Sequence, residues 1–293
     1  MNHFIRNNFL AIWVTMAVIF AFARKATVYQ QEPKKPETPL FTSPSATEKV
    51  FTNYWSAGKT ETSTYQIQEE IAGKITQAEA TLTFAIKPFD TDKQVETPSN
   101  QSSEAINVLK MSLQEKYDFS AISTVYAPLD IKLFPHAPKV THSFQSLSNL
   151  LVYQLNQHNR AYQIEEKSYA NNKVSKSLEL KRVWLEDEIW NRIRLSPETL
   201  PQDEFEIIPS LKFCSETQQS PTIQQAKGEI KDYTGTALQE KDLKVYALNY
   251  PATQRSIEIV FQKNFPYKIL AWTEKVLLNK QLTTRQAVLK KAL

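Results

Sequence analysis

Glu186, Asp187 and Glu188 form a run of carboxylates that could serve general acid–base catalysis. Two carboxylates whose surroundings push their pKa values apart can act as proton donor and proton acceptor. Consecutive residues on a helix point in different directions, so at most two of the three could meet one substrate. Acidic residues are also common in the first half of exposed helices, where they suit the positive end of the helix dipole. We therefore expect these side chains on a solvent-exposed helix surface.

Three histidines, His136, His142 and His158, could bind a transition metal through their imidazole nitrogens. His136 and His142 lie six residues apart, and the sequence contains no H-x-H, H-x₃-H or H-E-x-x-H spacing. We therefore expect no metal site. The alternative that stays open is a hydrolase site assembled from dispersed residues, with His136, His142 and Glu188 as its candidates.

Cys214 is the single cysteine of the chain. It cannot form an internal disulfide, and a zinc site that needs two or more cysteines is impossible within one chain. No cysteine-hydrolase signature surrounds Cys214, and the chain contains no G-x-S-x-G motif. We expect a buried structural thiol at the end of a strand, and we predict neither catalytic residues nor a cofactor.

The composition argues against two further classes of protein. The 293 residues include only 4 glycines, and none of them are clustered, so a glycine-rich phosphate-binding loop is not expected. The formal net charge is +4, from 35 basic and 31 acidic residues. Proteins that bind nucleic acids concentrate their basic residues in a stripe or patch, whereas here they are scattered among acids. We expect no nucleic-acid partner.

Aromatic side chains could line a cleft for an apolar ligand, because curved antiparallel sheets can enclose such ligands. Aromatic residues more often fill the core, and that interpretation stays open beside the first. The candidate cleft residues are Tyr54, Trp55, Trp190, Tyr267 and Trp272, with Trp184 as a sixth aromatic nearby in the sequence.

The elements that must position these residues are mostly strands. Apolar and polar residues alternate from Tyr65 to Ile71 and again from Ala78 to Ile86, which is the period of a half-buried strand. The intervening Ala72-Gly73-Lys74 predicts an antiparallel hairpin. Further strand patterns occupy residues 109–113, 122–126, 140–156, 162–169, 205–214, 223–231, 244–250, 257–262 and 269–272.

One amphipathic helix is predicted near residues 177–195. Leu185, Ile189 and Ile193 recur every four residues, and Ser196-Pro197 ends the pattern. The strands otherwise follow one another without intervening helices, which favours an antiparallel meander. We predict a mainly β (β-rich α+β) fold, either a curved antiparallel sheet or a partial barrel, with this one helix.

The sequence divides into four segments. Residues 1–23 have a basic start, an apolar run and an Ala21-Phe22-Ala23 end, as in a signal peptide, although the basic residues that follow also suit an uncleaved signal anchor. Residues 24–50 form a linker rich in Pro, Thr and Ser. Residues 51–274 are predicted as a single β-rich domain, and residues 275–293 as a basic C-terminal tail that could be helical.

Six segments between residues 53 and 274 resemble, in the same order, a family of secreted proteins and lipoproteins of Bacteroidota. Members of this family are sometimes labelled septum formation inhibitors. The segments are Asn53–Tyr65, Lys87–Val95, Trp184–Trp190, Phe205–Pro209, Tyr250–Ile259 and Phe265–Trp272. The resemblance implies an extracytoplasmic location and carries no reaction with it.

This chain departs from the family at two places. No cysteine follows the apolar run, so no residue there can accept the lipid that many relatives carry. Residues Ser146–Leu150 stand where relatives have a string similar to Trp-Cys-Gly-His. Any chemistry of that string is therefore expected to be lost in this member.

We expect an exported, non-enzymatic protein in the periplasm or on the outer face of the membrane. It would bind an envelope protein or a lipid-like, apolar ligand through its sheet, with an N-terminal membrane anchor if the signal is not cleaved. The alternative is the extracytoplasmic hydrolase described above. A purely structural envelope protein is the third interpretation.

Overall fold

The computed structural model describes residues 51, 53–55, 59–98, 102, 104–169, 175–278 and 280–292. The predicted signal segment 1–23 and linker 24–50 lie outside the described residues, so the predicted membrane anchor does too. Among the helices of the described part, none is both long enough and apolar enough to cross a membrane.

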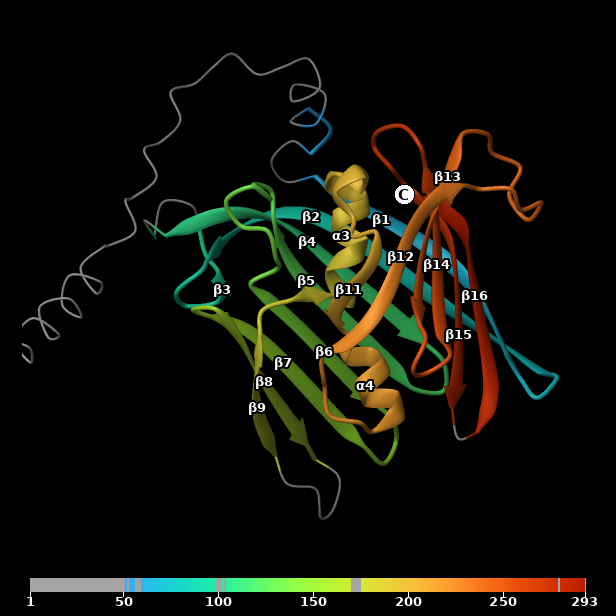
Figure 1. Cartoon of the computed structure of the whole chain (residues 1–293), viewed down its shortest axis with the longest axis horizontal. Helices are drawn as coiled ribbons and strands as arrows, with labels where there is room; N and C mark the ends of the chain where they lie inside the picture. Colours follow the sequence, from blue (N-terminus) through green and yellow to red (C-terminus); the bar gives the residue numbers. More distant parts are fainter. Residues whose placement is uncertain are drawn as a thin grey trace, which may run out of the picture. The chain divides into compact units, whose positions relative to one another are not determined.

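One large sheet dominates the described part of the chain (Figure 1). Fifteen of its 16 strands follow the order β10-β11-β12-β13-β14-β15-β16-β1-β2-β4-β5-β6-β7-β8-β9, and the remaining strand, β3, pairs with β2. Adjacent strands are antiparallel, except that β10 runs parallel to β11. The strands are β1 (Thr60–Ile71), β2 (Lys74–Asp90), β3 (Val95–Glu96), β4 (Ala105–Lys116), β5 (Ser120–Pro128), β6 (Lys139–Gln145), β7 (Leu150–His158), β8 (Ala161–Ser168), β9 (Lys176–Lys181), β10 (Trp184–Leu185), β11 (Asp203–Ile208), β12 (Gln224–Asp232), β13 (Leu243–Tyr250), β14 (Arg255–Gln262), β15 (Ile269–Leu278) and β16 (Gln281–Ala292).

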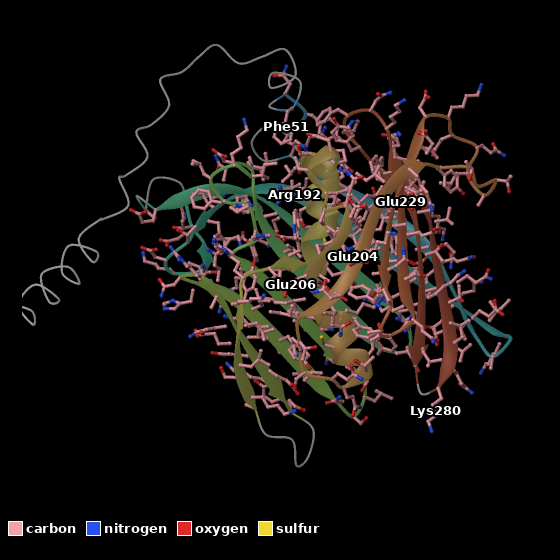
Figure 2. All side chains as sticks on the ribbon, viewed as in Figure 1. Phe51, Arg192, Glu204, Glu206, Glu229 and Lys280 are labelled. Atoms are coloured by element: carbon pink, nitrogen blue, oxygen red, sulfur yellow. The ribbon has the colours of Figure 1, made fainter. Side chains whose placement is uncertain are left out.

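The sheet confirms the predicted fold class, a curved and mainly antiparallel sheet. It is open, since its order ends at β9 on one side and at β10 on the other. An exposed ion pair between Lys181 Nζ on β9 and Glu206 Oε2 on β11, at 2.6 Å, links strands from the two sides. Glu206 lies on β11 together with Glu204 (Figure 2).

The predicted hairpin at Ala72-Gly73 is confirmed. β1 and β2 pair from Thr60–Ala85 to Ile71–Lys74, which leaves a two-residue turn. Ala72 and Gly73 have φ angles of 49° and 79°, as the common two-residue hairpin turn with two left-handed residues requires. Glycine meets this requirement without a steric cost.

A smaller cluster of buried residues is formed by Leu243, Val245, Val260 and Leu270 on β13, β14 and β15. The main core lies on the concave face of the sheet, where alternate residues of most of the longer strands are buried. Two short helices pack on this face (Figure 1). Helix α3 (Ile189–Leu195) contacts β4 and β5, and helix α4 (Leu211–Thr217) contacts β5 and β6. Two single 3₁₀ turns flank α3, namely η1 (Glu186–Glu188) and η2 (Pro197–Thr199).

The single helix predicted near 177–195 is correct only in its last third. Residues 176–181 form β9, at the edge of the sheet, and the α-helix begins at Ile189. A second helix, α4, occupies the end of the segment 205–214 that was predicted as a strand. Ser210 begins α4, because its side chain accepts a hydrogen bond from the Phe213 N–H at 3.2 Å.

Two other segments also differ from the sequence-based expectation. Residues 140–156 form parts of two strands, β6 and β7, which are joined by a turn around Ser146–Asn149. The predicted C-terminal tail, 275–293, is not a separate or helical segment, since its described residues complete β15 and form β16. β16 pairs with β1, so this segment is an internal part of the sheet; Lys280 lies in the turn before it (Figure 2).

Candidate functional site

The acidic run Glu186-Asp187-Glu188 is buried, and the expectation that it would be exposed was wrong. The three residues are 4%, 6% and 2% exposed. A buried carboxylate needs hydrogen-bond donors or cations to offset its lost hydration. Each of the three has different partners, and those partners come from distant parts of the chain. The run is therefore a set of three contacts that fix η1 and α3 on the sheet.

Glu188 holds a histidine and the loop around it. Its Oε1 accepts from Nδ1 of His136 at 2.8 Å, and its Oε2 accepts from the backbone N–H of Ala137 at 2.6 Å. The N–H of Leu185 adds a third hydrogen bond, at 3.2 Å. The ring of His136 also stands edge-on to Trp184, with centroids 5.1 Å apart. The imidazole is thus fixed in position, and Nε2 is left as the ring nitrogen without a partner among the described residues.

His136 lines an open cleft of about 920 Å³, which we call the polar cleft. It lies between the β2–β3 turn, the segment that precedes β6 and the β7–β8 turn (Figure 1). Phe134 and His158 also line the cleft. Half of the other residues that line it are amides, namely Gln94, Gln154, Asn156, Gln157, Asn159 and Gln163.

The strand register explains why these amides come together. Lys139 on β6 is opposite Asn156 on β7, and Asn156 is opposite Gln163 on β8. Their neighbours Leu155 and Ile164 are buried, so the polar row lies on the face of the sheet away from the core. Nζ of Lys139 donates to the carbonyl oxygen of Gln94 at 2.7 Å, which joins the β2–β3 turn to this row.

A network of buried ions lies on the concave face. Arg255 donates to Glu186 through Nη2 at 2.7 Å and to Glu274 through Nε at 2.9 Å. The hydroxyl of Tyr250 donates to Glu186 at 2.6 Å. Burial opposes the charge on Glu274, but Arg255 and Lys212 outweigh it and lower its pKa to about 2. Glu274 and Arg255 therefore stay ionised inside the protein.

Lys212 and Arg285 extend this network. Nζ of Lys212 donates to Glu115 at 2.8 Å, and Arg285 donates to Glu69 at 2.6 Å and to Glu216 at 2.7 Å. Burial alone would lower the pKa of Lys212, but the neighbouring carboxylates, Glu115 first, raise it overall. The network joins α4 to β4, β1 and β16, which indicates a structural role.

Asp187 lies beside a small cavity next to this network. Its Oδ2 accepts from the N–H of Leu211, the first residue of α4, at 3.0 Å. Burial, and then the negative charge of Glu186, raise the pKa of Asp187 to about 7. The cavity measures about 40 Å³ and is lined by charged residues such as Lys212 and Glu115. This volume suits one to a few water molecules and no organic ligand of ordinary size.

His142 does not join His136 and Glu188. It lies opposite Ser123 on the next strand, and Nδ1 is 2.9 Å from the Ser123 hydroxyl. Burial, and then the charge of Lys212, lower the pKa of His142 to about 3, so the ring is neutral at physiological pH. Of the three residues proposed for a dispersed hydrolase site, the structure brings together His136 and Glu188 only.

The five aromatic candidates divide into two groups. Trp190 and Trp272 meet edge to face at 5.2 Å beside the small cavity. Tyr54 and Trp55 are in contact with each other at 5.0 Å, and Phe265 connects Tyr54, at 5.3 Å, with Tyr267, at 5.8 Å.

The group around Tyr54 surrounds a buried ion pair. Arg194 makes two hydrogen bonds with Glu61, at 2.6 and 2.7 Å, and stacks over the rings of Trp55 and Phe84. Burial opposes ionisation of Glu61, but Arg194 outweighs it and lowers the pKa of Glu61. Aromatic rings and the guanidinium thus pack on one another in this region.

Arg192 follows a similar pattern on α3 (Figure 2). It donates to the carbonyl oxygen of Pro135 and stacks on Trp184 at 4.9 Å. Cys214 is buried in α4, as a structural thiol should be, although it lies on a helix and not at the end of a strand.

Within the described residues, no group of three or more His, Cys, Asp or Glu side chains is arranged to hold a metal ion. Comparisons with protein-family models, with curated protein sequences and with solved structures gave no match to this chain.

Proposed function

We propose that the protein is an exported, non-enzymatic protein of the cell envelope that binds a polar ligand in the polar cleft. The observation that carries the binding part is the cleft itself. Its volume of about 920 Å³ lies in the range of small-molecule sites, and its amide and imidazole groups converge from three separate segments. The small charged cavity on the concave face offers no comparable space, which disfavours an apolar ligand there.

The extracytoplasmic location rests on the sequence. Residues 1–23 have the pattern of a signal peptide or signal anchor, and the resemblance to secreted proteins and lipoproteins of Bacteroidota supports the same location. A fusion of residues 1–50 to alkaline phosphatase, an enzyme that is active only after export, tests this part. Phosphatase activity comparable to that of a known exported fusion supports export, and a cytoplasmic, inactive fusion contradicts it.

A pair of matched variants tests the binding part. Gln163 and Glu165 are both exposed on the same face of β8, but only Gln163 lines the polar cleft. Gln163→Trp should fill part of the cleft, whereas Glu165→Trp adds the same ring outside it. Saturation-transfer NMR against a mixture of small sugars, sugar phosphates and short peptides should show binding to the wild-type protein and to Glu165→Trp. Gln163→Trp should show no such binding. Equal binding by both variants would place the site elsewhere.

One observation favours a hydrolase as the second candidate. With Nδ1 held by Glu188, Nε2 of His136 could accept a proton from water in the cleft, as the histidine of a His–carboxylate pair does in many hydrolases. Turnover of p-nitrophenyl esters or glycosides that is lost in His136→Gln, and kept in His158→Gln, would support this candidate. Equal background rates for the wild-type protein and His136→Gln would remove it.

A further inference from the structure

We propose that the polar cleft binds a neutral, polyhydroxylated ligand, a carbohydrate chain; this inference rests on the proposed binding function. A hydroxyl group both donates and accepts hydrogen bonds, and so does a side-chain amide. Gln154, Gln157 and Gln163 make no side-chain hydrogen bond to any other residue that the structure describes, so their amides are available to a ligand.

Two buried amide oxygens at the cleft lack a donor. Oε1 of Gln94 and Oδ1 of Asn156 have no hydrogen-bond partner within the described part of the chain. Buried acceptors are normally satisfied, and an unsatisfied one destabilises the protein. A rotation of the Asn156 amide toward the cleft would let a ligand hydroxyl donate to it, whereas Nε2 of Gln94 already donates to the carbonyl oxygen of Thr91 at 2.6 Å. Asn156 therefore supplies an acceptor that a carbohydrate can satisfy.

The charges at the cleft do not favour an anionic ligand. None of the described residues that line it is an arginine, the residue best suited to phosphate. Lys139 is occupied by the carbonyl oxygen of Gln94, and its pKa is lowered by burial. Lys93 lies 3.5 Å from the carboxylate of Asp90, and Asp92 adds a further negative charge.

The strands that form the floor of the cleft offer no edge for an extended peptide, and β3, which pairs only with β2 among the described strands, is two residues long. A peptide that adds to a sheet needs a strand with unpaired backbone groups. β6, β7 and β8 are each paired on both sides. Phe134, by contrast, exposes 37% of its surface at the cleft, and an exposed aromatic ring can stack on the apolar face of a sugar ring.

Asn156→Leu is the variant that tests the carbohydrate proposal. Leucine has the same branching and the same number of side-chain heavy atoms as asparagine, and it removes an acceptor that has no partner among the described residues. The melting temperature should therefore stay about the same or rise. Glu165→Leu is the matched control on the neighbouring strand, outside the cleft. If Asn156→Leu fails to fold, Gln163→Leu, at an exposed position, replaces it.

The full-length protein in mild detergent would be titrated with maltohexaose, cellohexaose, chitohexaose and mannohexaose up to about 10 mM, followed by saturation-transfer NMR. Inositol hexakisphosphate and an uncharged hexapeptide are the comparison probes. We expect at least one hexasaccharide to bind, with an affinity reduced about tenfold or more in Asn156→Leu and within about twofold of wild type in Glu165→Leu.

The outcomes separate this inference from the proposed function. If only the phosphate or the peptide binds, and Asn156→Leu weakens it, the cleft is a binding site and the carbohydrate proposal is overturned. If none of the probes binds, both the carbohydrate proposal and the binding function are contradicted. Hexasaccharide binding that is equal in the wild-type protein and both variants would also overturn the proposal.

Discussion

Glu188 on η1 accepts a hydrogen bond from His136 at 2.8 Å, and these two residues connect the interior of the protein to the polar cleft. Glu188 is 2% exposed and also accepts the N–H groups of Ala137 and Leu185. Its three donors fix both the ring of His136 and the path of the chain before β6. The wall of the cleft therefore depends on the buried carboxylate of Glu188. A ligand in the cleft need not contact Glu188 itself.

Arg255→Met should destabilise the fold strongly. The substitution leaves Glu186 buried without its cation and leaves Glu274 with only the more distant Arg285 and Lys212. Removing one partner of a buried ion pair costs about 3–5 kcal/mol. Urea unfolding followed by circular dichroism measures the change. Lys290→Met is the control, because its pair with Glu79 is more than half exposed and should contribute less than about 1 kcal/mol. A similar loss of free energy of unfolding in the two variants would show that the buried ion pairs of Arg255 do not stabilise the fold more than an exposed pair does.

Asp187→Asn should stabilise the protein in a manner that depends on pH. The folded protein holds Asp187 protonated up to a pKa of about 7, whereas the unfolded chain ionises near 3.8. The wild-type protein therefore loses stability as the pH rises between these values, by up to about 1.4 kcal/mol per pH unit. The advantage of Asp187→Asn should grow from pH 4 to pH 7 and then level off. Unfolding curves at several pH values would measure the difference in free energy of unfolding between the variant and the wild-type protein. A difference that grows as the pH falls would contradict the expectation.

His142→Gln should remove part of the acid sensitivity of the fold. His142 stays neutral in the folded protein down to a pKa of about 3, against 6.5 for the free group, because burial disfavours its charged form. Its contribution to stability is complete above pH 6.5 and is lost as the pH falls toward 3, by up to about 1.4 kcal/mol per pH unit. The stabilities of the wild-type protein and the variant should converge or cross on acidification. Parallel pH profiles would contradict a buried, neutral His142.

The thiol of Cys214 should be unreactive in the native protein. Cys214 is 3% exposed, and burial, followed by the charge of Asp187, raises its pKa. Thiolate is the reactive form, so Ellman's reagent should modify Cys214 only after unfolding in urea. Rapid modification under native conditions would show that α4 opens readily.

The strands were predictable where one face is apolar and the other polar. From Tyr65 to Ile71 and from Ala78 to Ile86 the alternation is regular, and Gly73 supplies the turn between them. β16 escaped prediction because two of its buried residues, Thr283 and Arg285, are polar, so the period of two is hidden. Arg285 is tolerated inside only because Glu69 and Glu216 pair with it.

The predictions of where the helix begins and of an exposed acidic run were wrong for a related reason. β9 reads KSLELK, and its two leucines have the two-residue spacing of a strand. The helix prediction extended the four-residue repeat of Leu185, Ile189 and Ile193 too far toward the N-terminus. The burial of Glu186, Asp187 and Glu188 depends on partners 69, 24 and 52 residues away in the sequence, namely Arg255, Leu211 and His136. No local pattern reports such contacts. The sequence carried only a weak indication of the polar cleft, namely a set of uncharged amide residues at strand positions that face away from the core.

The most direct test of the account is an NMR titration of the protein labelled on its histidine rings. His136 and His158 line the polar cleft, and His142 lies in the core, so one sample contains both the probes and an internal control. Addition of the hexasaccharide that binds best should shift the ring signals of His136 and His158 and leave those of His142 in place. Shifts at His142, or no shift at His136 while the ligand is bound, would contradict a binding site in the polar cleft.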